Sequence, residues 1–126
     1  MRRRPAGPIV PIVVFLLVLA TAACGGDGGG EAPACERAVE TTSVTMRDFS
    51  YEPTCVAAGS GAELAITNEG QAPHTFTIES DADTAELDLP AGERGTLRIP
   101  ELEAGTYEVT CTYHPQMVAA LRIVPA

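Results

Sequence analysis

The sequence predicts an all-β protein built as a small antiparallel β-sandwich of about seven or eight strands. From Thr41 onward, runs of about five to seven residues alternate between apolar and polar side chains, as strands with one buried face do. Gly, Pro, Asn and Asp separate these runs at short intervals. None of the runs has the periodicity of an amphipathic helix. Short alternating strands between turn residues favour two packed sheets.

The individual strands follow from the alternation and from the turn residues that end it. We expect strands at 43–47, 63–67, 75–79, 96–99, 106–111 and 119–124. The stretch from Ser80 to Asp88 is acidic and poorly periodic, so we expect a loop or a short edge strand there. An immunoglobulin-like sandwich is the rival fold, but the absence of Trp and the spacing of the Cys residues argue against it.

The first 40 residues differ in composition from the rest. A basic start leads to an apolar run at 9–20, which is shorter than the about 20 residues that span a bilayer and is typical of a secretory signal. The string 19–24 resembles a bacterial lipoprotein signal. That resemblance implies removal of residues 1–23 and acyl chains on Cys24, although Thr21 stands where the pattern usually has Leu. Simple secretion after cleavage nearby, or an uncleaved anchor, are the alternatives.

Residues 24–40 are rich in Gly and are expected to form a flexible tether to a folded domain at 41–126. The tether would hold the domain at the extracytoplasmic face of the cell membrane through the lipid on Cys24. If the chain is not lipidated, we expect a secreted protein.

Charge limits the partners that the protein can have. The full chain has a formal net charge of −9 at pH 7 and contains no Lys. Loss of residues 1–23 with their three Arg would leave five Arg against 17 acidic residues, a charge of −12. Such a surface repels nucleic acid and anionic headgroups, so we expect no nucleic-acid partner and no attachment through a basic patch. A partner with a basic docking face is favoured, and we expect a monomer.

The four Cys residues divide into three roles. Cys24 is the candidate for lipidation. Cys35 and Cys55 flank the first expected strand and are expected to form a disulfide, since disulfides are stable outside the cytoplasm. Cys111 then remains as a free thiol. A disulfide between Cys111 and either Cys35 or Cys55 is the alternative, because sequence alone does not set the connectivity.

The candidate site residues converge if two of the strands are antiparallel. His74 has the same parity as Phe76, so it points toward the core, and Cys111 has the same parity as Val109. His74 begins its strand and Cys111 ends its own, so antiparallel pairing would bring both to one end of the sandwich. His114 and Met117 lie in the loop that leads from Cys111 to the last strand, at the same end.

These four residue types predict a copper site. One thiolate, two imidazoles and a weak thioether form the ligand set of an electron-transfer copper centre, whereas zinc seldom recruits Met. Met117 as core filler is the alternative for the fourth ligand. Cys111 and His114 as a thiol nucleophile and its base would need an orienting third group and a cleft, and the sequence indicates neither.

The string 111–117 resembles the ligand loop of the cupredoxins, with the short Cys-x-x-His-x-x-Met spacing of amicyanin and pseudoazurin. The family's strand before the Cys ligand is similar to residues 105–107, and the segment bearing its first His ligand is similar to residues 68–76. Its opening strand with a Phe/Pro turn is similar to residues 46–53. The resemblance implies a Greek-key sandwich and one type 1 copper held by the four ligands His74, Cys111, His114 and Met117. It also implies that redox partner proteins dock near His114, on an apolar patch formed by Ala72, Pro73, Pro115 and Val118.

Two positions depart from the family pattern. Thr75 stands where the family often has an Asn that ties the ligand-bearing loops together, and we expect Thr75 to form fewer such hydrogen bonds. Ala119 replaces a common Gly, which we expect to be a small packing change. Five acidic residues upstream form either a solvated loop, which we favour, or a docking patch or calcium site: Glu79, Asp81, Asp83, Glu86 and Asp88.

Three functions of different classes follow from these observations. The leading hypothesis is a one-electron carrier, not an enzyme, that cycles between Cu(I) and Cu(II) at the membrane. The second is a copper-handling protein that delivers or sequesters the metal with the same ligands. The third is an interaction module without a metal. A copper oxidase is disfavoured, because the chain has only two His and both are used by one mononuclear site.

Overall fold

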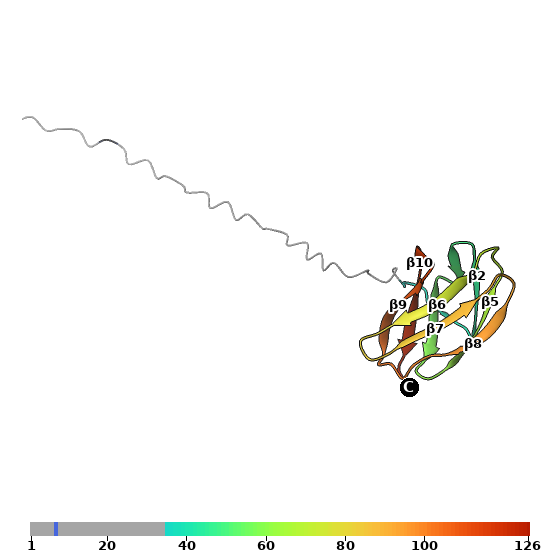
Figure 1. Cartoon of the computed structure of the whole chain (residues 1–126). Helices are drawn as coiled ribbons and strands as arrows, with labels where there is room; N and C mark the ends of the chain where they lie inside the picture. Colours follow the sequence, from blue (N-terminus) through green and yellow to red (C-terminus); the bar gives the residue numbers. More distant parts are fainter. Residues whose placement is uncertain (1–6, 8–34) are drawn as a thin grey trace, which may run out of the picture.

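The computed structural model describes residue 7 and residues 35–126. The predicted signal peptide at 1–23, Cys24 as lipidation site and most of the predicted tether therefore lie outside the described residues. Residues 35–126 form two β-sheets packed face to face, with the connections between strands at the two ends of the sandwich (Figure 1). No helix in the described part of the chain is long and apolar enough to cross a bilayer.

Ten strands build the two sheets. They are β1 (Val39–Glu40), β2 (Ser43–Arg47), β3 (Ser50–Glu52), β4 (Cys55–Gly59), β5 (Glu63–Asn68), β6 (His74–Glu79), β7 (Thr84–Leu89), β8 (Arg94–Arg98), β9 (Gly105–Cys111) and β10 (His114–Val124). The larger sheet has the order β1-β4-β10-β9-β6-β7, and the smaller sheet has the order β3-β2-β5-β8. The predicted all-β sandwich is confirmed.

The sheets are mixed rather than purely antiparallel. In the described residues β4 runs parallel to both β1 and β10, and β2 runs parallel to β5. The strand β4 lies inside the larger sheet, and its first three residues, Cys55–Ala57, are all buried. A strand buried on both faces has no alternating pattern, which is why the periodicity did not indicate it.

The acidic stretch after Ser80 contains a strand. Residues Thr84–Leu89 form β7, which pairs with β6 at the edge of the larger sheet. The expectation of a loop is therefore wrong for these residues, and the alternative of a short edge strand is confirmed. Only one face of an edge strand has to be apolar, and here the exposed positions carry Glu86 and Asp88.

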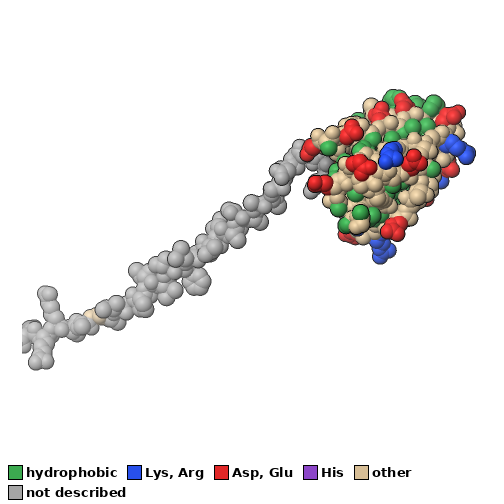
Figure 2. Space-filling view, turned by 90° about the horizontal axis from the view of Figure 1, so that it is seen from below, with side chains coloured by type: hydrophobic (Ala, Val, Ile, Leu, Met, Phe, Trp, Pro, Cys, Tyr) green, Lys and Arg blue, Asp and Glu red, His purple; other side chains and the backbone are tan. Residues whose placement is uncertain are grey.

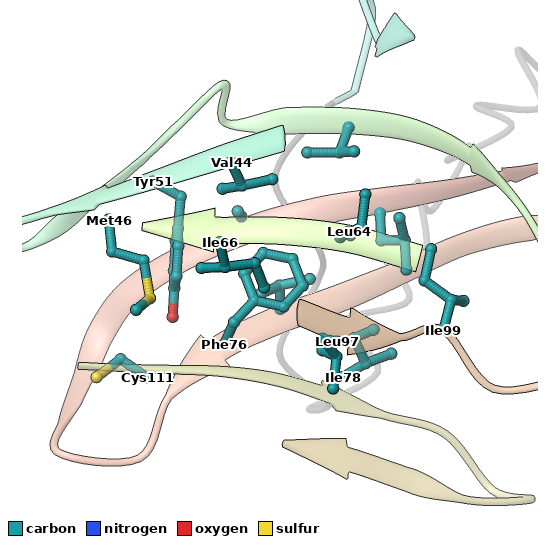
Figure 3. Close-up of a cluster of buried hydrophobic side chains, with 14 of the residues drawn as sticks. Val44, Met46, Tyr51, Leu64, Ile66, Phe76, Ile78, Leu97, Ile99 and Cys111 are labelled. Carbon is teal, nitrogen blue, oxygen red and sulfur yellow. The ribbon is translucent and has the colours of Figure 1, made fainter. Parts of the chain in front are cut away.

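The core lies between the two sheets and accounts for most of the buried apolar surface. Alternate residues of β2 and β5 point into it, and β6 and β9 supply the facing side chains (Figure 3). The central members are Val44, Met46, Leu64, Ile66, Phe76, Ile78 and Val109, all at most 2% exposed. Each large apolar side chain buried in this way contributes about 1.5–3 kcal/mol to stability.

A disulfide joins Cys35 to Cys55, with the two Cα atoms 5.5 Å apart, as the sequence predicted. Cys111 stays free and buried, so the alternative pairing is excluded. The guanidinium of Arg122 in β10 donates a hydrogen bond to the Cys35 carbonyl at 2.8 Å. Cys35, which we expected in the tether, is thus bonded to the folded domain. Closing a loop of 20 residues stabilises the fold by about 3 kcal/mol in the chain-entropy model.

Tyr51 links the smaller sheet to the strand that begins with His74. Its ring is buried edge-on against Phe76, with the ring centroids 5.6 Å apart. Its hydroxyl donates a hydrogen bond of 2.7 Å to the carbonyl of Thr75. Burial raises the pKa of Tyr51 well above its usual value, because the phenolate would lose its hydration.

We predict that Tyr51→Phe lowers the free energy of unfolding by about 1–2 kcal/mol at neutral pH, since the buried Thr75 carbonyl loses its donor. Above pH 10 the unfolded chain gains stability from ionising Tyr51 while the folded chain keeps it neutral. The parent should therefore lose stability there, and the difference between the two proteins should narrow. Urea unfolding from pH 7 to 11 measures this, and a difference that widens with pH contradicts it.

Candidate metal centre

The pairing of β6 with β9 places His74 and Cys111 at the same end of the sandwich. The two strands are antiparallel, with Thr77 opposite Thr110 and Ile78 opposite Val109. His74 is the first residue of β6 and Cys111 is the last residue of β9. The structure therefore confirms that His74 and Cys111 lie at one end of the sandwich, as their positions in the two strands predicted.

Three of the four candidate ligands meet at one point. The Cys111 Sγ lies 3.8 Å from His74 Nδ1 and 3.7 Å from His114 Nδ1. Ligand atoms of His74, Cys111 and His114 all lie within 4.8 Å of one another, and this is the one such group of His, Cys, Asp or Glu in the described residues. The five acidic residues of the Glu79–Asp88 region form no comparable cluster there.

Met117 reaches the core through an irregularity in β10. The ladder between β9 and β10 pairs Cys111 with His114 and resumes at Thr110 and Val118, with a register shift between them. A bulge of this kind bends a strand and re-aims its side chains. Met117 lies at its end, fully buried, in the same core cluster as Cys111. His114 and Met117 thus belong to β10, although we expected them in a loop before the last strand.

The donor set fits a copper ion. A metal–sulfur bond of about 2.3 Å and a metal–nitrogen bond of about 2.0 Å in a trigonal plane separate the two ligand atoms by about 3.7 Å. The two Sγ–Nδ1 distances here are 3.8 and 3.7 Å. A thiolate with two imidazoles is the soft, nitrogen–sulfur set that copper electron-transfer sites use, with a weak thioether as a fourth ligand. His74 and Cys111 are buried, whereas His114 is partly exposed.

Asn68 shapes the loop that carries His74. Its side-chain amide donates hydrogen bonds to the carbonyls of Ala72 and Leu89, at 2.9 and 3.0 Å. Its side-chain oxygen accepts the N–H of Gly70 at 2.9 Å. Because Asn68 is fully buried, these bonds are shielded from water and hold the loop to the end of β7.

Asp48, in the turn between β2 and β3, contacts both this loop and the His74 ring. Its carboxylate accepts hydrogen bonds from the N–H groups of Gln71 and Ala72, at 2.8 and 3.2 Å. Oδ1 also lies 2.9 Å from His74 Nε2. The hydrogen bond from Gln71, followed by the His74 ring, holds the pKa of Asp48 below its usual value. The sequence did not indicate Asp48 as a site residue, because 26 residues separate it from His74.

Thr75 connects the two ligand-bearing segments. Its Oγ1 accepts the N–H of Thr112 at 2.8 Å, and its own N–H donates to Cys111 Sγ at 3.4 Å. The hydroxyls of Thr77 and Thr112 both donate to Glu86 in β7, at 2.8 and 2.7 Å. Thr75 thus forms two hydrogen bonds to the segment that carries Cys111, and Thr77, Thr112 and Glu86 extend this network. Glu86 belongs to this network rather than to a solvated loop.

The exposed side of the site is more aromatic than we expected. Phe49 packs its ring edge against His114, with the centroids 4.8 Å apart, and remains 53% exposed. Tyr113, 48% exposed, donates a hydrogen bond to Asp88. Pro73 and Pro115 of the predicted patch are exposed, and its other two members, Ala72 and Val118, are partly so. The alternating pattern could not reveal the two aromatic side chains, because both lie in turns.

Comparisons with known proteins agree with this fold. A family model described as a cupredoxin-like domain matches residues 8–123. No curated protein matches the chain. One similar solved structure is a novel purple cupredoxin from Nitrosopumilus maritimus, at 17% identity and a TM-score of 0.54 over 67% of this chain and 100% of that one.

Two further solved structures are similar to the chain. One is the Cu(I) form of a mutant amicyanin, at 25% identity and a TM-score of 0.54, covering 71% of this chain and 87% of amicyanin. The other is a copper-containing nitrite reductase from Thermus scotoductus SA-01, at 20% identity and a TM-score of 0.55. That match covers 76% of this chain but 27% of the reductase, so it extends over a minor part of that enzyme.

Proposed function

The chain belongs to the family of cupredoxin-like domains, and from this premise we propose that it carries single electrons on one copper ion at the extracytoplasmic face of a membrane. The observation that supports this most strongly is the convergence of one thiol and two imidazoles, whose ligand atoms lie within 4.8 Å of one another at one end of the sandwich. The copper-containing proteins among the similar structures support the choice of metal.

His74, Cys111 and His114 would hold the metal in this proposal, with Met117 as the weak fourth ligand. A bound copper ion supplies a single centre that exchanges one electron between Cu(I) and Cu(II). The protein's part is to keep the ligand atoms in place in both oxidation states. Three of the four side chains, His74, Cys111 and Met117, are buried. The networks around Asn68 and Thr75 hold the segments that carry His74 and Cys111.

Redox partners would dock at the end of the molecule where His114 reaches the surface. His74 and Cys111 are at most 1% exposed, so His114 offers the shortest route from solvent to the site among these three. The exposed ring of Phe49 beside it gives a partner an apolar surface to bury. Acidic side chains are scattered over the face seen in Figure 2, where arginines are fewer. A partner with a basic docking face would therefore associate faster.

Attachment to the membrane through acyl chains on Cys24 completes the proposal. The support is the apolar run at 9–20 and the small residues before Cys24. A lipid anchor would confine the carrier near membrane-bound partners. The mass of the N-terminal peptide of the mature protein tests this: a diacylglyceryl Cys at its start supports it, and an unmodified N-terminus elsewhere refutes it.

We propose that the protein has no catalytic activity of its own. The chain contains two His, and both are placed at the same centre, so no further imidazoles remain for a second metal that would bind and reduce a substrate. The resemblance to a nitrite reductase covers 27% of that enzyme and does not alter this proposal.

The proposed bond between Cys111 and copper leads to a spectroscopic prediction. Addition of one equivalent of Cu(II) to the purified protein should produce an intense visible band from thiolate-to-copper charge transfer, with the narrow copper hyperfine splitting of such sites. Cys111→Ser should lose the band. A pale spectrum typical of ordinary copper complexes, unchanged in Cys111→Ser, would favour an interaction module without a metal.

A further prediction separates electron transfer from copper handling, which is the alternative function of the same ligands. A carrier of electrons should cycle repeatedly between Cu(I) and Cu(II) without loss of copper, because buried ligands release the ion slowly. Electrochemical cycling followed by metal analysis measures retention. Rapid loss of Cu(I) to a competing chelator during this cycling would support delivery or sequestration of copper instead.

A further inference from the structure

The contact between Asp48 and His74 joins a partly exposed carboxylate to a buried imidazole ring. The His74 ring is fully buried, while the Asp48 side chain is 31% exposed and reaches the ring from the turn between β2 and β3. Nε2 lies 2.9 Å from Asp48 Oδ1, and Nδ1 faces Cys111 Sγ. The two nitrogens of one imidazole thus face a carboxylate and the candidate metal position.

The carboxylate determines which nitrogen of His74 carries the proton. A neutral imidazole has one N–H donor and one lone pair, and an ionised carboxylate can only accept hydrogen bonds. Asp48 at Nε2 therefore requires the N–H to be there, which leaves the lone pair on Nδ1. Nδ1 is the nitrogen that points toward Cys111 and His114. The opposite tautomer would place two acceptors face to face and direct a proton at the metal position.

We propose that Asp48 is a positioning residue of the metal centre, which fixes the tautomer and orientation of His74 and clamps the loop that carries it. The same carboxylate accepts the N–H groups of Gln71 and Ala72, so ring and loop are held by one group. This inference rests on the proposed copper site. A carboxylate behind a metal-binding His also raises the basicity of the ligand.

Gly70 leaves room for this contact. A Cβ at Gly70 would collide with Asp48 Oδ1 and would lie 3.0 Å from His74 Nε2 and 3.1 Å from Asn68 Oδ1. The position is buried, so a side chain there has no alternative space. Among the described residues around the loop, Gly70 is therefore the one whose lack of a side chain allows carboxylate and imidazole to approach.

The turn that carries Asp48 has an unusual backbone. Phe49 adopts φ = +78°, a conformation that a residue with a bulky side chain rarely adopts, and its ring remains largely exposed. The result of this turn is that consecutive residues contact both His rings, Asp48 at His74 and Phe49 at His114. A strained residue of this kind persists where the surrounding structure holds it, and it is commonly found at functional sites.

The tautomer of His74 can be measured without any metal. In the metal-free protein, long-range ¹H–¹⁵N correlation spectra at neutral pH assign the protonated nitrogen of each imidazole. We expect His74 to carry its proton on Nε2, with a slowly exchanging, downfield proton signal. Protonation of His74 on Nδ1 would overturn the proposal. Because copper is absent, this result is independent of the proposed function.

A pair of matched variants then tests the consequence for the metal. Asp48→Asn keeps an oxygen for the Gln71 N–H but presents an amide donor to His74. Asp88→Asn removes the same charge from a β7 position that bonds Tyr113 instead. We expect Asp48→Asn to populate the Nδ1–H tautomer and to weaken Cu(II) affinity about 10–100-fold. Asp88→Asn should retain the parent's tautomer and affinity.

Gly70→Ala provides an independent route to the same loss. Its added Cβ should displace the Asp48 carboxylate while every polar group stays in the chain, so it should weaken copper binding in the same direction as Asp48→Asn. Circular dichroism should first show that both variants are folded. A positioning role for Asp48 would then be refuted if Asp48→Asn bound copper as tightly as Asp88→Asn. Loss of copper binding by the parent itself would instead refute the proposed function, and the metal-free spectra would still decide the tautomer.

Discussion

The antiparallel register of β6 and β9 is the constraint on which the candidate centre depends. Thr77 opposite Thr110 places His74 and Cys111 at one end of the sandwich, both pointing inward. A slip of one residue would turn every side chain of one strand to the other face and separate the thiol from the imidazole. The register is strongly specified, because Phe76 and Ile78 bury their side chains in the core (Figure 3). Val109, opposite Ile78, belongs to the same buried cluster. The apolar core and the metal centre therefore depend on one alignment.

The polar side chains around the candidate metal centre hold the segments that carry its ligands. Asn68, Asp48 and Thr75 each bond to a segment that carries His74 or Cys111, and together they connect the β2–β3 turn, the loop before β6 and the end of β9. Such support matters for electron transfer, since a site that keeps its geometry in both oxidation states has little to rearrange. His114 and Phe49 contact each other on the exposed side of the site, where the proposed docking of redox partners would take place.

Many of the strands and the four candidate ligands could be predicted from the sequence. The same reasons explain why some strands and contacts were missed. Strands with one buried face, such as β2 and β5, show alternation, and the short loop after Cys111 places three candidate ligands within seven residues. The strand β4, whose first three residues are all buried, lacks that alternation. The strand β7 has it, but its acidic outer face made a loop equally plausible from the sequence. Asp48 was missed because its partner is distant in the chain and only the fold brings them together. The register shift in β10 that directs Met117 inward has no local signal either.

The central claim is that the fold sets the ligand positions before any metal binds, and a pair of crystal structures tests it most directly. Structures of the metal-free and the Cu(II)-loaded protein, both at neutral pH, should show His74, Cys111 and His114 in the same rotamers, displaced by less than about 0.5 Å. Copper should lie between their Sγ and Nδ1 atoms. A metal-free structure in which either His ring turns away from Cys111, or a loaded structure with copper bound elsewhere, would contradict the account.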